Sequence, residues 1–377
     1  METVLVYRHQ LFKPSEPFIQ HQALALRSFR PVFVGRYRAG APIDPAVRAL
    51  TLRDRPGATG SLQAAFNVLT RDPGCYLSLI RGETPVLIHA HFGVEGLYAL
   101  GLARKRGIPL LTTFHGFDAT VGKRALLRSR KVSWIHYALF RRDLMLGGTL
   151  FICVSEFIRR RLLSLGFPEK KTVTHYIGID REALPVRSED QQAKIILHVA
   201  RLVEKKGTAY LLRAFAAIAG MEPEAILVII GDGQLRGELG VLAGELGIAG
   251  RVRFLGQCDH PTTLRWMARA WVFCLPSTTA RSGDAEGLGM VLLEAAARGV
   301  PVIGTRHGGI PEAVEDGVTG FLVTERSDAE IADRLLILLR SDSTRISMGE
   351  AGRRMTAEKF DLQRQTRKLE DLYRSLL

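Results

Sequence analysis

Two carboxylates, Glu286 and Glu294, enclose a glycine-containing segment whose chemistry suits a phosphorylated ligand rich in hydroxyl groups. The residues between them favour a helix that begins near Leu288–Gly289, and the unpaired N–H groups at a helix start attract anions such as a diphosphate. Glu286 would accept hydrogen bonds from a hydroxylated group beside that phosphate. Glu294, about one turn into the helix, would accept them from a ribose diol. Taken alone, the spacing also fits a Glu286 that caps the helix and a solvated Glu294.

Two cations, Arg201 and Lys206, follow the apolar run Ile195–Ala200, which has the pattern of a buried strand. Ligand phosphates collect at the carboxyl ends of parallel strands, so these cations would neutralise a diphosphate leaving group. The alternative is an exposed loop in which they pair with Glu204.

Glycines follow another apolar run, which ends at Ile230. Gly231 and Gly233 would let the backbone approach a ligand or a neighbouring strand. The next glycine, Gly237, comes too late for a dinucleotide fingerprint, which disfavours a nicotinamide-dependent enzyme. The sequence has neither a Gly-x-Ser-x-Gly elbow nor a P-loop, which argues against acyl hydrolases and ordinary nucleoside triphosphatases.

Histidines gather at the ends of two expected strands in the first half of the chain. His89 and His91 end one apolar run, and His115 follows the next run, shortly before Asp118. Clustered histidines suit a metal ion, but the carboxylates expected around a hydrolytic metal are missing. No Asp-x-Asp pair occurs to chelate a divalent ion on a nucleotide diphosphate. We therefore expect no metal cofactor.

Alternating strands and helices must position these residues, because the whole chain has the pattern of βαβ units around mostly parallel sheets. We expect an α/β fold with two doubly wound sheets and a ligand at the carboxyl ends of their strands. The expected strands of the first set are Thr3–Val6, Val32–Val34, Val86–Ala90, Leu110–Phe114, Leu150–Val154 and Val173–Ile177. Those of the second set are Ile195–Ala200, Ala225–Ile230, Val252–Leu255, Trp271–Leu275 and Val300–Gly304.

A polar stretch, Asp180–Lys194, lacks apolar periodicity and places a domain boundary near residue 185. The chain turns helical from Asp328, and its last segment, Leu362–Leu377, carries one apolar face that must pack on another surface. A length of 377 residues and a hydrophobic content of 46% are ample for two domains.

The cellular compartment follows from what the sequence lacks. Its apolar stretches are far shorter than the roughly 18 residues of a membrane-spanning helix. The start at Met1 lacks the basic beginning and the longer apolar core of a signal peptide, so we expect a cytoplasmic protein. The four cysteines form no Cys-x-x-Cys pair, which predicts reduced thiols at Cys75, Cys153, Cys258 and Cys274.

Taken together, these motifs resemble those of the retaining glycosyltransferases of family 4, which have the GT-B fold of two facing Rossmann-like domains. The resemblance covers nearly the whole chain, and its most specific part is Glu286–Glu294 followed by Gly299–Gly304, Gly308–Glu312 and Gly317–Val323. Three further segments resemble the bacterial exopolysaccharide or colanic-acid-type branch of the family; they are Ser15–Ile19, His89–Gly93 and His115–Asp118.

The resemblance implies an acceptor-side domain over residues 1–184, a nucleotide-sugar-binding domain over 185–357 and a final helix, 358–377, that returns to the first domain. It implies a retaining transfer, without metal or other cofactor, from a nucleotide-sugar donor to a hydroxyl of a glycan or lipid-linked acceptor. His115 and Glu286 would be the catalytic residues, and the donor base would lie near Leu255–Asp259. The implied donor-binding residues are Arg201, Lys206, Gly231, Cys258, Gly287, Leu288, Gly289, Met290 and Glu294.

The sequence departs from the family pattern in the loop after the first strand. Many members carry a glycine pair there, whereas Arg8–Pro17 contains no glycine. Side chains of Ser15 and Glu16 would then face donor or acceptor, and His91 and Asp118 are further candidates for the acceptor side. The alternatives are a nucleotide-sugar epimerase of the same fold, a glycan synthase with a soluble acceptor, and a sugar-nucleotide-binding scaffold without catalysis.

The charge of the chain is concentrated in its first half. The formal net charge is +14; residues 1–180 hold 26 basic and 12 acidic residues, whereas residues 181–377 hold 26 of each. Within Lys123–Arg142 the cations alternate with leucines and aromatic residues, which favours either contact with an anionic membrane surface or an ordinary solvated helix face. No nucleic-acid-reading module is recognisable, so we do not expect nucleic acid as a partner.

Overall fold

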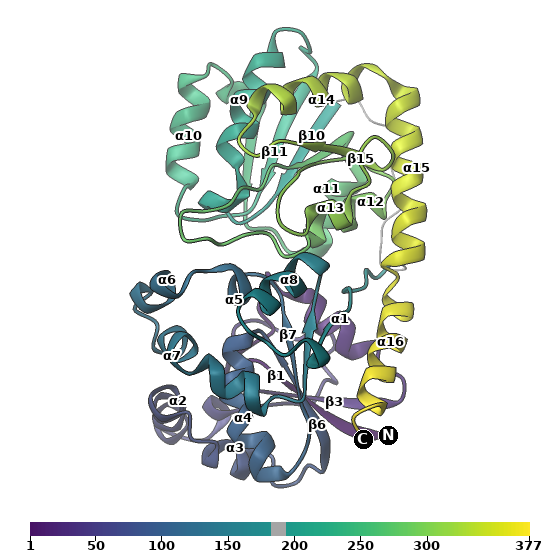
Figure 1. Ribbon diagram of the computed structural model, residues 1–377. Helices are drawn as coiled ribbons and strands as arrows, with labels where there is room; N and C mark the ends of the chain where they lie inside the picture. Colours follow the sequence, from purple (N-terminus) through teal and green to yellow (C-terminus); the bar gives the residue numbers. More distant parts are fainter. Residues whose placement is uncertain (182–193) are drawn as a thin grey trace. The chain divides into compact units, whose positions relative to one another are not determined.

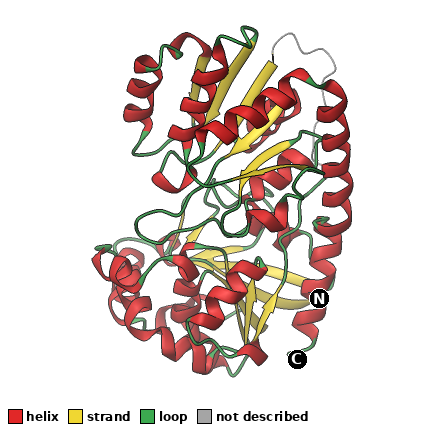
Figure 2. Ribbon diagram, turned by 45° about the horizontal axis from the view of Figure 1, so that its top comes forward, coloured by secondary structure: helices red, strands yellow, loops and turns green. Residues whose placement is uncertain are grey.

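The computed structural model describes residues 1–181 and 194–377, and the chain forms two compact units. The first unit comprises Met1–Gly178 together with Leu362–Leu377, and the second comprises Ile179–Asp361. The expected boundary near residue 185 lies outside the described residues, as does most of the polar stretch around it. In each unit helices flank a parallel sheet (Figures 1 and 2).

The first unit is built on a seven-stranded sheet of order β5-β3-β1-β6-β7-β8-β9, in which every pairing is parallel. Its strands are β1 (Glu2–Tyr7), β3 (Phe29–Gly35), β5 (Ala49–Thr51), β6 (Pro85–His91), β7 (Leu110–Phe114), β8 (Leu150–Cys153) and β9 (Thr172–Thr174), and a separate pair joins β2 (Gln10–Leu11) to β4 (Tyr37–Arg38). The order reverses between β1 and β6, so a ligand is expected beyond the carboxyl ends of these two strands.

Helices connect the strands of the first unit, and the last helix of the chain joins them. They are α1 (Pro17–Leu24), α2 (Thr59–Thr70), α3 (Gly74–Leu79), α4 (Gly93–Arg106), α5 (Phe117–Thr120), α6 (Lys123–Arg128), α7 (Val132–Gly147), α8 (Glu156–Ser164) and α16 (Leu362–Arg374). Leu369 and Tyr373 of α16 enter the core of the first sheet beside Val4 and Leu87, so the final helix returns to the first unit as predicted. It begins at Leu362 rather than at residue 358, because α15 continues to Lys359.

The second unit repeats the scheme with a six-stranded sheet of order β12-β11-β10-β13-β14-β15, again wholly parallel. Its strands are β10 (Lys194–Val199), β11 (Ala225–Ile230), β12 (Val252–Gly256), β13 (Val272–Leu275), β14 (Val302–Thr305) and β15 (Gly320–Val323). Its helices are α9 (Thr208–Ala219), α10 (Arg236–Glu245), α11 (His260–Arg269), α12 (Met290–Ala296), α13 (Ile310–Ala313), α14 (Asp328–Arg340) and α15 (Asp342–Lys359). The strand order reverses between β10 and β13.

Alternation along the strands divides the second core into two faces. Leu227 and Ile229 pack in the cluster with α9, α10 and α14, whereas Val228 and Ile230 pack in the cluster with α11, α12 and α13. Because both faces are covered, the strand is apolar throughout, as buried parallel strands are. Among the described helices none is long and apolar enough to span a bilayer.

The predicted strands agree with the structure apart from their ends. The expected Val173–Ile177 is shorter, since β9 ends at Thr174 and the His175 imidazole Nε2 instead bonds the Gln365 carbonyl of α16, at 2.9 Å. The strands β2, β4, β5 and β15 were not predicted from the sequence.

Candidate functional site

A buried ion pair lies at the point where the second sheet reverses its order. Lys206 belongs to a helical turn, Glu204–Lys206, after β10, and Glu286 lies in the long loop after β13. The Lys206 Nζ lies 2.6 Å from the Glu286 Oε2, with 13% and 14% of the side chains exposed. Burial raises the pKa of Glu286, but the attraction of Lys206 and Lys205 outweighs it and brings the pKa to about 2. Glu286 is therefore a carboxylate at neutral pH.

Further cations surround this pair. The Nζ of Lys205, itself 8% exposed, lies 3.0 Å from the Asp284 Oδ1. Arg201 is exposed and pairs with no carboxylate among the described residues. Burial lowers the pKa of Lys206 and the attraction of Glu286 raises it, while the positive charge of Arg201 adds to the lowering. Glu204 accepts from the Arg281 N–H instead, at 3.3 Å, so the alternative pairing with Arg201 does not form. The guanidinium of Arg201 thus adds a further positive charge near Lys206.

A hydrogen-bond chain that the sequence did not reveal holds the backbone of Glu286. The N–H of Glu286 donates to the His307 Nε2 at 3.1 Å, so that nitrogen carries no proton. The His307 Nδ1 then donates to the Glu325 Oε1 at 2.9 Å. Glu325 also accepts from the Thr279 N–H at 2.7 Å, in the same loop as Glu286. Loops after β13, β14 and β15 are thereby tied together.

Two glycines explain how the strand ends come so close. Gly207, with φ +66°, leaves no room for a Cβ, which would stand 1.8 Å from the Pro276 carbonyl oxygen. A Cβ on Gly231, with φ +127°, would stand 1.9 Å from the Ala200 carbonyl oxygen. The Gly231 N–H donates to the Gly256 carbonyl at 2.7 Å. Gly231 therefore serves the packing of β10 against β11, and its N–H is already engaged.

Glu294 is not the solvated helix residue of the alternative interpretation. Its side chain is 16% exposed and its Oε1 lies 3.3 Å from the Nε2 of His260, the first residue of α11. Helix α12 begins at Met290 after Gly289, whose φ of +86° belongs to the left-handed region, so the start falls one or two residues later than expected. Gly287 and Leu288 are buried beside it, and Cys258 packs half-buried against the same core.

The first unit gathers histidines at the carboxyl ends of β6 and β7. The Nδ1 of His91 lies 3.1 Å from the Nε2 of His115, while the other ring nitrogen of His115 is buried with no partner in the described part of the chain. Burial and neighbouring charges lower the pKa of both imidazoles well below the ordinary value, so both are neutral. Phe18 and Phe92 pack around His115, with ring centroids 5.1 and 4.5 Å away.

Asp118 has a structural part in this cluster. Its carboxylate accepts from the N–H groups of Gly93, Gly116 and His115 at 2.8, 2.9 and 3.2 Å. Burial nevertheless raises the pKa of Asp118 to about 6. The carboxylate thus fixes the loops that present His91 and His115.

The glycine-free first loop is organised by Arg8. Its Nε and Nη2 both donate to the Glu16 carboxylate at 3.0 Å, and it also pairs with Glu95. The Glu16 carboxylate is thereby held inside the loop, whereas Ser15 is exposed. Phe12 has a φ of +60°, a conformation that favours glycine. We expected the Glu16 side chain to face donor or acceptor, whereas its carboxylate forms an ion pair with Arg8 inside the loop.

The comparisons with known proteins decide the family. Residues 21–183 match the model described as Glycosyltransferase Family 4, and residues 180–355 match Glycosyl transferases group 1. The chain is 32% identical over 293 residues to the putative colanic acid biosynthesis glycosyltransferase WcaL of Salmonella typhimurium, a match that covers 76% of this chain and 70% of WcaL. The chain belongs to glycosyltransferase family 4.

Another relative is the amylovoran biosynthesis glycosyltransferase AmsK of Erwinia amylovora, 31% identical over 265 residues; the match covers 69% of this chain but only 61% of AmsK. Anabaena Alr3699/HepE in complex with UDP and glucose has a TM-score of 0.78 at 20% identity, over 100% of both chains. The sucrose-phosphate synthase of Thermosynechococcus elongatus also has a TM-score of 0.78 at 20% identity, over 100% of this chain and 99% of that one. These likenesses confirm the GT-B fold.

The sequence motifs of this family 4 glycosyltransferase predicted some of the residues that lie together in the second unit, but not all of them. The structure brings Lys206 and Glu286 into contact and leaves Arg201 beside them, while Glu294 lies on the next helix with His260. The missed residues are Lys205, His307 and Glu325. Of these, His307 had a signal in the sequence, because it directly precedes the Gly308-Gly309 pair after β14.

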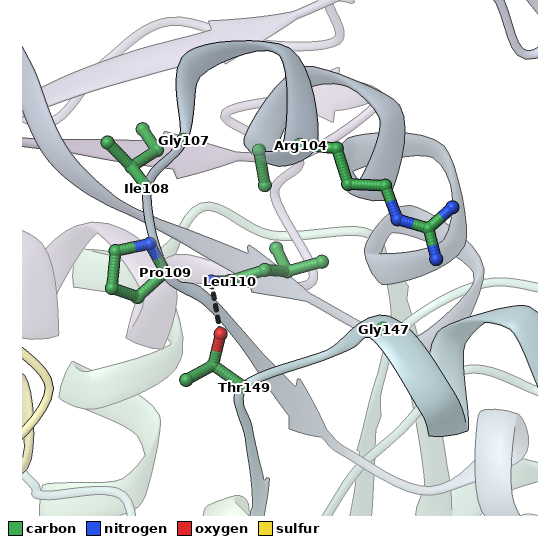
Figure 3. A pocket seen from close by; sticks show the side chains of 8 residues that line it. Arg104, Gly107, Ile108, Pro109, Leu110, Gly147 and Thr149 are labelled. Atoms are coloured by element: carbon green, nitrogen blue, oxygen red, sulfur yellow. Dashed lines mark hydrogen bonds between the residues drawn. The ribbon is translucent and has the colours of Figure 1, made fainter.

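The first unit has a pocket of about 310 Å³ that none of the candidate site residues lines. It is lined by Arg104, Gly147 and Thr149 and by the segment Gly107–Leu110, at the amino end of β7 (Figure 3). Because α/β ligands bind beyond the carboxyl ends of the strands, we assign this pocket no part in the site. In the described ranges, 1–181 and 194–377, no three His, Cys, Asp or Glu side chains converge as metal ligands would.

Proposed function

We propose that the protein is a retaining, metal-independent glycosyltransferase that moves a sugar from a nucleotide-sugar donor to a hydroxyl of a glycan or lipid-linked acceptor in cell-surface polysaccharide synthesis. One observation carries the proposal: an ionised Glu286 held by Lys206, with the exposed Arg201 beside them, at the reversal point of the second sheet. The relatives named for colanic acid and amylovoran biosynthesis support the product class. The Anabaena neighbour, crystallised with UDP and glucose, supports a nucleotide-sugar donor.

Charge at the leaving group is the main chemical demand. When the bond between the anomeric carbon and the diphosphate oxygen breaks, negative charge grows on that diphosphate, and fixed cations stabilise it. Arg201 has no carboxylate among the described residues to satisfy, so its guanidinium is available to the diphosphate. Lys206 would share its ammonium protons between Glu286 and the diphosphate, and Glu294 would bind the ribose.

Glu286 would position the sugar through its hydroxyl groups. Hydrogen bonds to a charged partner are roughly twice as strong as neutral ones, so an ionised carboxylate orients hydroxyls well. His115, neutral in its buried setting, would contact the transferred sugar from the acceptor side. In a same-face reaction the acceptor oxygen bonds to the anomeric carbon on the face that the diphosphate leaves, and the acceptor proton passes to the departing diphosphate oxygen.

Arg201→Ala gives the sharpest test, because this side chain is exposed and makes no ion pair with the described residues whose loss would disturb the fold. A charge-assisted hydrogen bond is worth roughly 1.5–3 kcal/mol, so donor affinity should fall about 10–100-fold at an unchanged melting temperature. Isothermal titration with the sugar nucleotide measures this. Arg253→Ala, which removes an exposed arginine of β12, is the matched control. Equal affinity of Arg201→Ala and the wild type would place the phosphate clamp elsewhere.

The donor must first be found. A thermal-shift panel of UDP-, GDP-, ADP- and dTDP-sugars identifies it, because a ligand that binds only the folded state raises the melting temperature. With that donor, Glu286→Gln should abolish most turnover while donor binding persists. Unchanged turnover in this variant would show that Glu286 is not catalytic, and donor binding by the wild type without any turnover would favour a binding scaffold. Product anomeric configuration by NMR tests retention, and unchanged turnover in EDTA tests metal independence.

A further inference from the structure

Helix α2 of the first unit turns its apolar residues outward. None of its twelve residues is charged, and Leu62, Phe66 and Leu69 are 67%, 54% and 64% exposed. These residues recur at the spacing of one helix face. The opposite face buries Gly60, Ala64 and Asn67, which are small or polar. This is the reverse of the arrangement of a surface helix in a water-soluble protein.

Helix α7 continues the exposed apolar surface. Its Leu139 and Leu146 are 53% and 68% exposed. Arg71, the residue that follows α2, covers the Phe140 ring at 4.1 Å and lies 3.5 Å from the Asp143 Oδ2, so the two helices lie side by side. Figure 1 shows α2, α7 and α6 along one side of the first unit. We call the face formed by Leu62, Phe66, Leu69, Leu139 and Leu146 the α2–α7 surface.

Exposed cations lie next to the α2–α7 surface. Residues 119–142 contain seven basic residues and no acidic one. Those of α6 and the following loop are exposed, and no ion pair forms to them within residues 1–181 and 194–377; they are Lys123, Arg124, Arg128, Arg130 and Lys131. Leu127, 37% exposed, lies among them. Solvated cations of a helix face would normally alternate with carboxylates.

The combination selects the occupant. An apolar protein partner would leave these cations unexplained, and a polyanion such as nucleic acid would leave Leu62, Phe66 and Leu69 in water. An anionic lipid bilayer satisfies both, because its phosphates attract the cations while its acyl boundary takes up the apolar side chains. We propose that the α2–α7 surface docks on an anionic phospholipid bilayer, with α2 inserted at the interface and α6 on the headgroups.

This inference rests on the proposed function in one respect: a protein docked on the bilayer would find a lipid-linked acceptor there. The docking itself is independent of donor chemistry. Donor affinity measured without lipid and vesicle binding measured without donor therefore separate the failure of one proposal from that of the other.

The test uses the full chain and two kinds of vesicle, one of phosphatidylcholine alone and one that also contains about 30 mol% phosphatidylglycerol. Flotation separates vesicle-bound from free protein. Wild-type protein should bind the anionic vesicles and be released by salt. Lys123→Gln/Arg124→Gln/Arg128→Gln should bind about 100-fold more weakly, since each cation contributes about fivefold. Arg213→Gln/Arg253→Gln/Arg265→Gln, with the same charge change on the second unit, should bind as the wild type does. Equal binding to neutral vesicles, or equal loss in both triple variants, overturns the proposal.

Insertion of α2 has its own readout. The indole introduced by Phe66→Trp should shift its emission to shorter wavelength on anionic vesicles and be quenched by brominated acyl chains. Leu62→Gln/Leu69→Gln should weaken vesicle binding at least tenfold, in keeping with the transfer of leucine side chains from water. Val241→Gln, at a residue 63% exposed on α10, is the control. Insertion is contradicted if the Phe66→Trp variant binds vesicles but the emission of its new indole does not change. It is also contradicted if the leucine substitutions change only the self-association of the protein, measured by light scattering.

Discussion

At the scale of the residue, the site is a balance between burial and charge. Glu286 is ionised because Lys206 and Lys205 lie close to it, although burial alone would favour the protonated acid. Lys206 is subject to the opposite influences, since burial lowers its pKa and Glu286 raises it. The pair is therefore stable only while both partners are present. Removal of either leaves an uncompensated charge, which is costly inside a protein.

Removal of Lys206 should move the acid limb of activity. In the wild type the pKa of Glu286 is about 2, so this side chain is a carboxylate at every pH well above that value. In Lys206→Met the burial of Glu286 remains while its principal cation is lost, so the pKa should rise. We expect the acid limb of kcat/KM to shift upward by at least about one pH unit, beyond the general fall in activity.

Lys206→Arg is the matched control, because it keeps the cation. It should restore the acid limb even if its different shape limits turnover. Superimposable acid limbs in Lys206→Met and the wild type would show that Glu286 is not the group that must be ionised.

Sequence alone could predict Lys206 and Glu286 but not their contact. Eighty positions separate them, and the contact arises because β10 and β13 are neighbours at the reversal of the sheet. His307 and Glu325 were missed for another reason. Their part is to hold the backbone of Glu286. Although His307 precedes the Gly308-Gly309 pair, this part depends on how the loops after β13, β14 and β15 meet, which the sequence does not show.

At the scale of the element, the strand ends are set by close backbone contacts. Short runs of apolar and β-branched residues predicted β7 and β11 with their observed bounds, as expected for strands that are buried on both faces of a parallel sheet. The first loop could not be predicted in the same way. Its family glycines are absent, and the structure instead uses Arg8 as an internal tie and accepts a left-handed Phe12.

Gly207→Ala should destabilise the second unit. The new Cβ would stand 1.8 Å from the Pro276 carbonyl oxygen, and the backbone φ of +66° is unfavourable for alanine. We expect a loss of at least about 3 kcal/mol in the free energy of unfolding, measured by urea titration. Gly220→Ala has open space around its Cβ and should be neutral or stabilising. If the two variants were equally stable, the loop after β13 would have to move away from the new Cβ at little cost in free energy.

Acid should weaken the first unit through His89. Its ring nitrogens lie 2.6 Å from the Tyr373 hydroxyl and 2.6 Å from the Thr113 hydroxyl, and burial with the charge of His175 lowers its pKa to about 3. The unfolded chain binds this proton near pH 6.5, so the stability that the neutral imidazole provides is complete above that pH and is lost as the pH falls toward 3.

His89→Gln should therefore flatten the pH dependence of stability by about 1.4 kcal/mol per pH unit between about pH 6 and 4. Hydrogen exchange of β6 and β7 peptides, corrected for intrinsic rates, measures it. His198→Gln changes a buried histidine of β10 and should leave the slope in β6 and β7 unaltered. An unchanged slope in His89→Gln would show that another group takes up the proton.

At the scale of the whole molecule, the two halves of the sequence differ in charge, and the last helix of the second half belongs to the first unit. The cations proposed to bind the donor lie in the half whose acidic and basic residues are equal in number, so the proposed phosphate binding would need only local cations. The surplus of the first half lies instead beside the exposed apolar residues of α2 and α7. Charge distribution could be counted from the sequence, but only the structure shows that α2 faces outward, because its apolar spacing also fits a buried face.

The final helix provides the last prediction. Although α16 directly follows residues of the second unit, Leu369 is 1% exposed in the core of the first, and Glu370 accepts from the Arg27 and Ser28 N–H groups, both at 2.7 Å. Leu369→Ala should lower the local stability of β1 and β6 by about 2–5 kcal/mol and leave β10 and β11 unchanged, as measured by hydrogen exchange. Arg367→Ala, on the exposed face of α16, should change neither. Equal losses in both sheets would mean that the two units unfold as one, since a cavity in one core can weaken the other only if their unfolding is coupled.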